Sequence, residues 1–79
     1  MNRSEILEGL KEILSKVKPK IDTSTVSEQS ILSTELGIDS LSMLLMSLAI
    51  EDKFKFKFDP KGVFTSVGDV INYIEKDIN

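Results

Sequence analysis

The segment from Ser40 to Phe54 is apolar on two opposite sides of the helix that its residue spacing predicts. One side, here called the methionine side, carries Met43, Met46, Ile50 and Phe54. The other, the leucine side, carries Leu41, Leu44, Leu45 and Leu48. One apolar side is enough to attach a helix to its own core, and burial on every side is hard to arrange in 79 residues. We therefore expect the methionine side to face the core and the leucine side to dock partners. The alternative is that both sides pack internally.

An amphipathic segment from Ile6 to Val17 predicts the first helix, because its apolar residues recur at helical spacing. Asn2 and Glu5 fit a capping box at its start, and Pro19 ends it. The polar stretch that follows loses this periodicity, apart from a short helical turn expected at 30–35. Loops this long are uncommon in compact domains. Its scattered apolar residues are expected to hold it to the core: Val26, Ile31, Leu32, Leu36 and Ile38.

A closing helix is predicted after Ser66, which fits a capping box with Asp69. Before it, alternating Phe and Lys residues up to Phe58 have strand-like spacing, but the sequence offers no second strand to pair with them. We expect an extended, anchored loop there, followed by about one helical turn with Val63 and Phe64 pointing inward. The sequence thus predicts a single all-α domain over 1–79, a small four-helix bundle with a long first loop and a short third helix.

The string Leu36-Gly37-Ile38-Asp39-Ser40-Leu41 stands at the end of the polar connection and opens the apolar helix. Asp39 has the side-chain acceptor that suits an N-cap, so Ser40 falls in the first turn, exposed and at the positive end of the helix dipole. A phosphodiester on Ser40 would be favoured by about 0.3–1 kcal/mol. The chain has no His and no Cys that could activate this serine as a nucleophile. A presented serine of this kind indicates a residue that another protein modifies.

Composition excludes several classes of function. Without His or Cys there is no zinc site and no disulfide, and no glycine-rich phosphate loop or spaced acidic calcium motif is present, so we expect no enzyme and no metal. Acidic residues number 13 against 10 basic ones, and no basic stripe for a nucleic acid is present. The longest apolar run, Met43 to Met46, is too short to insert into a membrane. The N-terminus lacks the pattern of a signal peptide, and we expect a cytoplasmic monomer.

The G-I-D-S-L string resembles the attachment motif of acyl carrier proteins, and the order of helices and connections resembles the same family. The resemblance implies that a phosphopantetheinyl transferase moves 4′-phosphopantetheine from coenzyme A onto Ser40, with Asp39 as the helix cap beside it. The arm would carry acyl groups as thioesters to acyl-transferring, condensing or ligating enzymes of fatty-acid, polyketide or related biosynthesis. The acyl chain is expected between the second helix and the last two, near residues that could equally be plain core: Met46, Ile50, Phe58, Val63 and Phe64.

Two positions depart from the family pattern. Where the family usually has acidic residues early in the second helix, this chain has Ser42 and Leu45. Partner enzymes that recognise those carboxylates through basic patches would lose these contacts. The departures indicate a specialised carrier that serves a polyketide, modified-lipid or aminoacyl pathway. The alternative function is a helical interaction or dimerisation module that is not a carrier and uses the apolar second helix without Ser40.

Overall fold

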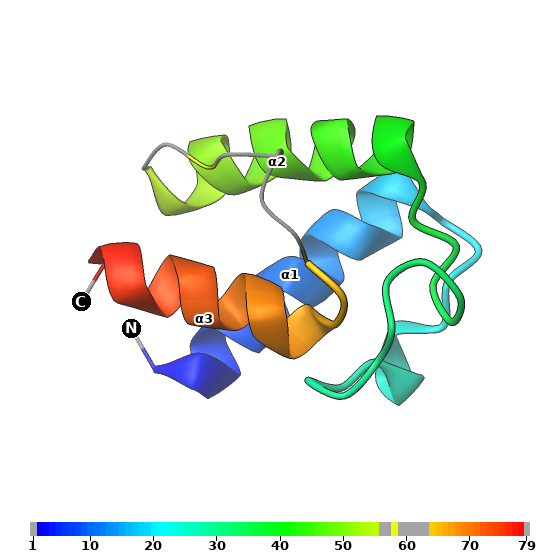
Figure 1. The fold of residues 1–79 in the computed structure, drawn as a ribbon, viewed down its shortest axis with the longest axis horizontal. Helices are drawn as coiled ribbons and strands as arrows, with labels where there is room; N and C mark the ends of the chain where they lie inside the picture. Colours follow the sequence, from blue (N-terminus) through cyan, green and yellow to red (C-terminus); the bar gives the residue numbers. More distant parts are fainter. Residues whose placement is uncertain (1, 56–57, 59–63, 79) are drawn as a thin grey trace.

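Three α-helices make up most of the computed structural model, which describes residues 2–55, 58 and 64–78. They are α1 (Arg3–Val17), α2 (Ser40–Phe54) and α3 (Val67–Ile78), and a short 3-10 helix, η1 (Thr23–Thr25), lies between α1 and α2. Helix α1 packs against both α2 and α3 (Figure 1). The predicted all-α class is therefore confirmed over the described residues. The predicted short third helix, with Val63, lies outside them.

The helix ends are determined by the capping contacts that the sequence predicts. Asn2 Oδ1 accepts a hydrogen bond from the Glu5 amide at 2.9 Å, and Glu5 Oε1 accepts one from the Asn2 amide at 3.2 Å. The Ser66 hydroxyl accepts from the Asp69 amide at 3.3 Å, while Asp69 Oδ2 accepts from the Ser66 amide at 3.1 Å. Both capping boxes are confirmed. Helix α1 ends two residues before Pro19, which cannot continue a helix.

The core is built from one apolar side of each helix, as the helical spacing predicts. Helix α2 faces the core with its methionine side, where Met46 and Ile50 are fully buried. Helices α1 and α2 approach closely at Gly9, where an added Cβ would lie 2.8 Å from Phe54 Cζ. The long connection adds three buried side chains, Val26, Leu32 and Ile38, so it is held to the core as expected.

The helical turn predicted at 30–35 is present as a single turn that does not extend into a helix. The structure has a hydrogen-bonded turn there, in which the amides of Glu35 and Leu36 both donate to the Ile31 carbonyl, at 3.0 and 3.1 Å. Ile31 itself forms an isolated antiparallel bridge with Ser66. This pairing keeps the backbone extended where a helix would have to begin. It also gives the first amide of α3, that of Val67, an acceptor in the connection.

An ion-pair network that the sequence did not indicate joins the start of α1 to the connection and to α3. The Arg3 guanidinium donates to Glu28 at 2.5 Å, to Asn72 at 2.7 Å and to Glu75 at 3.1 Å. The hydrogen bond from Arg3 holds the pKa of Glu28 below its usual range. Because these partners are distant in sequence, the network links segments that no local pattern connects.

Candidate functional site

The start of α2 presents Ser40 as the sequence predicts. Asp39 has an extended backbone, and its Oδ1 accepts a hydrogen bond from the Ser42 amide at 2.8 Å, so α2 begins at Ser40. That hydrogen bond from the Ser42 backbone lowers the pKa of the Asp39 carboxyl, and the nearby charge of Lys18 acts in the same direction. The chain reaches this cap through Gly37, whose positive φ of 66° suits glycine.

Ser40 is exposed. The chain contains no His or Cys, and the described residues hold no group of acidic side chains that could bind a metal. The Ser40 hydroxyl therefore has no histidine beside it, the usual base next to a nucleophilic serine. It is accessible to another protein, and a phosphodiester attached to it would sit at the favourable end of the helix dipole.

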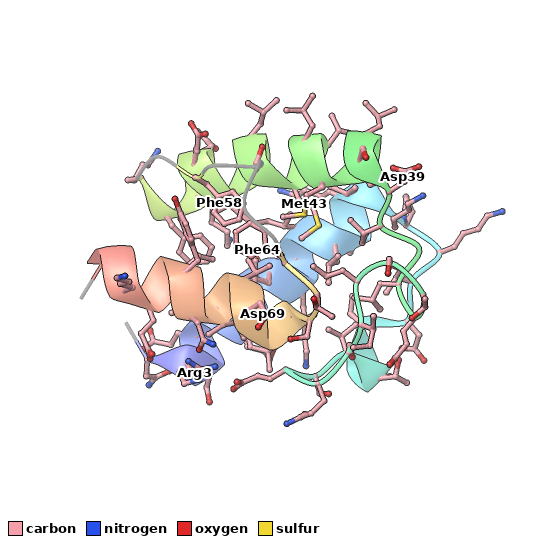
Figure 2. All side chains as sticks on the ribbon, viewed as in Figure 1. Arg3, Asp39, Met43, Phe58, Phe64 and Asp69 are labelled. Carbon is pink, nitrogen blue, oxygen red and sulfur yellow. The ribbon has the colours of Figure 1, made fainter. Side chains whose placement is uncertain are left out.

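A pocket of about 240 Å³ lies beside Ser40; we call it the Ser40 pocket. Its lining is about half apolar and comes from α2, from the connection before it and from the segment before α3: Leu32, Ser33, Ile38, Asp39, Ser40, Met43 and Phe64. Figure 2 shows Met43 and Phe64 between α2 and α3. A pocket with apolar walls on one side and an exposed, modifiable serine on the other can hold an apolar group attached through that serine.

The predicted acyl-pocket residues divide into two groups. Phe64 is half-buried and lines the Ser40 pocket. Met46, Ile50 and Phe58 do not line it; all three are buried in the core. Val63 lies outside the described residues. The structure thus brings Phe64 to Ser40 and leaves the other described residues deeper in the molecule.

Four residues of the pocket lining were missed from the sequence as candidates for the site: Leu32, Ser33, Ile38 and Met43. Met43 could have been found, because it is three residues after Ser40 and so lies one helical turn away. Ile38 could have been found from its position just before the Asp39 cap. Leu32 has no local signal; it reaches the pocket because the backbone of its segment pairs with that of residues 65–67.

The leucine side of α2 is in water. The exposed fraction of its four side chains ranges from 46% to 66%. A row of side chains projects from α2 on the side away from α3 (Figure 2). The alternative in which both sides of α2 pack internally is therefore wrong for this structure, while docking on the leucine side stays a prediction. Ser42, in the first turn of α2, is buried.

Charge on α2 is confined to its C-terminal end. The helix has no charged residue before Glu51. Near that end Lys53 pairs with Glu12 of α1 at 2.6 Å. The half of α2 that adjoins Ser40 is thus apolar and uncharged on its outer side. None of the described helices is long and apolar enough to cross a lipid bilayer.

Comparison with known proteins places this geometry in a family. The model of the phosphopantetheine attachment site family matches residues 8–74, a range that contains Ser40 and the whole Ser40 pocket. The chain is 35% identical to an acyl carrier protein of Thermotoga maritima, over 98% of this chain and 96% of that protein. It is 38% identical to an acyl carrier protein of Thermobifida fusca, over 95% of this chain and 96% of that protein. It is 36% identical to a meromycolate extension acyl carrier protein of Mycolicibacterium aurum, over 95% of this chain and 78% of that protein.

Proposed function

This chain belongs to the acyl carrier proteins, and from that membership we propose that Ser40 is the residue that bears its 4′-phosphopantetheine arm. Members of the family are carriers rather than enzymes. The chain accordingly carries acyl groups on a covalently attached arm in fatty-acid or related lipid biosynthesis. The thiol of the arm supplies the thioester that holds the acyl group.

The observation that carries the assignment is the difference in exposure among the three serines of α2. Ser40 is exposed, whereas the side chains of Ser42 and Ser47 are only 6% and 1% exposed. A transferase must reach the hydroxyl that it modifies, so of these three serines only Ser40 is available. The Asp39 cap begins the helix at this residue, and the helix dipole favours the phosphodiester there.

Replacing Ser40 by Ala tests the assignment. The variant and the wild type are incubated with coenzyme A and a broad-specificity phosphopantetheinyl transferase, and the mass of each product is measured. We expect wild type to gain the arm and Ser40→Ala to gain nothing, with an almost unchanged melting temperature because Ser40 is exposed. Ser33→Ala is the matched control, since Ser33 is also exposed and lines the same pocket. An arm on Ser40→Ala, or its absence from Ser33→Ala, would contradict the assignment.

The carried acyl chain enters the molecule at the Ser40 pocket. The pocket opens beside the attachment residue, and Ile38, Met43 and Phe64 supply apolar walls. Beyond Phe64 lies the buried ring of Phe58, with the two ring centroids 5.1 Å apart. The core residues expected near the chain, Met46 and Ile50, lie deeper and closed in this structure. Insertion that far requires the core to open.

The leucine side of α2 docks the enzymes that load and use the carrier. It is exposed and adjoins Ser40, and no charged residue of α2 precedes Glu51. Docking therefore depends on apolar burial by the transferase and by acyl-transferring, condensing or ligating enzymes. Enzymes that use basic patches to recognise carboxylates at the positions of Ser42 and Leu45 are poor partners, which supports a specialised pathway. The monomeric state and the cytoplasmic location remain predictions from the sequence.

A further inference from the structure

Phe64 stands between two hollows on the described surface. On one side it lines the Ser40 pocket, opposite Met43 of α2 (Figure 2). It also lines a second hollow of about 340 Å³, on α3, together with Asp69, Asn72, Tyr73 and Lys76. Phe64 therefore lines both a space next to the proposed attachment residue and a larger space along the last helix.

Other aromatic rings hold Phe64 in this position. Its ring stacks on that of Phe58, with an interplanar angle of 24°, and meets the ring of Tyr73 edge-on, with the centroids 5.6 Å apart. Phe58 and Tyr73 also contact each other, at 4.9 Å between centroids. We call these three residues the aromatic cluster. Because Phe58 is buried, the cluster is supported from the core side, and Phe64 cannot move inward without displacing it.

The backbone next to Phe64 is fixed as well. The amide of the following residue, Thr65, donates to Asp69 Oδ2 at 2.9 Å. The Thr65 carbonyl accepts from the Leu32 amide at 3.0 Å. Leu32 is itself a lining residue of the Ser40 pocket, so this hydrogen bond ties one lining residue to the neighbour of another, Phe64. Phe64 is thus a fixed part of the pocket wall.

We propose that Phe64 is a chain-length stop, which limits the acyl group that this carrier shelters to a short one. The inference rests on the proposed attachment at Ser40. The Ser40 pocket, at about 240 Å³, is below the range of about 300–1,000 Å³ that is usual for small-molecule pockets. If a methylene takes about the volume of a water molecule, roughly 30 Å³, the volume of the pocket corresponds to about eight carbons. The rest of a longer chain meets Phe64 and remains outside the pocket.

A series of acylated carriers tests this inference. Wild type and Phe64→Ala are loaded with butanoyl, hexanoyl, octanoyl, dodecanoyl and hexadecanoyl arms from the acyl-coenzyme A thioesters, and a mass spectrum confirms each product. The melting temperature is then measured, because an apolar group that binds only the folded chain raises it. For wild type we expect the melting temperature to rise with chain length up to octanoyl and then to stop rising. Removing the ring of Phe64 should join the two hollows, so the melting temperature of Phe64→Ala should continue to rise with chain length up to dodecanoyl.

The chain-length limit is the length beyond which the melting temperature stops rising. It is obtained by comparing chain lengths within one variant, so a general loss of stability in Phe64→Ala does not hide it. If Phe64→Ala does not fold, Phe64→Leu replaces it in the assay. Its chain-length limit should also be longer than that of wild type, but by less. Leu45→Ala, a truncation on the exposed leucine side, is the control and should keep the wild-type limit. A wild-type rise that continues past octanoyl, or one limit shared by wild type and the Phe64 variants, would overturn the inference alone. Mass spectra without an arm on Ser40 would instead refute the proposed function, and this inference with it.

Discussion

Replacing Leu45 by Ala distinguishes a docking surface from a buried one, because Leu45 lies in the middle of the leucine side of α2. Its side chain is 46% exposed, whereas that of the next residue, Met46, is 1% exposed. The substitution removes three carbon atoms, whose full burial would contribute about 0.8 kcal/mol each. With about half of the side chain already in water, the expected loss of unfolding free energy is about 1 kcal/mol or less. Met46→Ala leaves a core cavity and should cost about 2–5 kcal/mol.

The assay for stability is urea unfolding followed by circular dichroism on the wild type and both variants. Binding is measured in parallel as the dependence of arm transfer on carrier concentration, with a phosphopantetheinyl transferase. If Leu45 is a central contact, Leu45→Ala should lose about 1 kcal/mol or more of binding, which is at least about fivefold in affinity. Binding should also be less sensitive to salt than docking by charge pairs. Salt screens interactions between exposed charges, over about 8 Å at physiological ionic strength, but does not screen apolar burial.

Three results would refute this reasoning. A loss of stability in Leu45→Ala as large as that in Met46→Ala would mean that the leucine side is packed in solution. Unchanged transfer by Leu45→Ala, at wild-type stability, would mean that this residue does not contact the transferase. A steep decrease of binding with salt would place recognition on charged residues such as Glu51 instead.

Further substitutions examine the helix cap and the packing of α1. Asp39→Ala should lower the melting temperature and slow arm transfer, because the Ser42 amide loses its acceptor. The pKa of Asp39 is lowered in the folded state, so its stabilising effect is present above the ordinary aspartate pKa range and is lost as pH falls through the folded-state pKa. The melting temperatures of wild type and Asp39→Ala should therefore converge in acid. Equal melting of the two at neutral pH would mean that α2 begins elsewhere. Gly9→Ala should destabilise the fold by about 1–3 kcal/mol despite the better helix propensity of alanine, because its Cβ would lie 2.8 Å from Phe54 Cζ. A variant more stable than wild type in thermal unfolding would contradict this close packing.

The helices could be predicted from the sequence because the interactions that define them are local. The bounds predicted for α2, Ser40 to Phe54, are those observed. The cap at Asp39 and the capping boxes of α1 and α3 join residues three positions apart, so the sequence alone encodes them. Periodicity likewise identified the apolar side of each helix. The exposed position of Ser40 at the helix start could be predicted for the same reason, because Ser40 directly follows its cap.

The pairing that precedes the turn at 30–35 could not be predicted in this way. The Ile31 backbone forms a bridge with Ser66, which is distant in sequence. The Arg3 network is similar, because its partners Glu28 and Glu75 belong to other segments. Contacts of this kind form only when the helices have packed, and they prevail over weak local preferences.

The sequence by itself therefore determined that the chain is helical, where its main helices begin, and that Ser40 is presented at a helix start. It also determined that α2 has two apolar sides. Only the tertiary structure decided that the methionine side is buried and the leucine side exposed, because both are equally apolar and α1 covers only one of them. The structure also decided the walls of the Ser40 pocket, since Leu32 and Phe64 reach it through backbone pairing between distant segments. Spacing along the chain shows which residues share a side of a helix, but packing decides what that side meets.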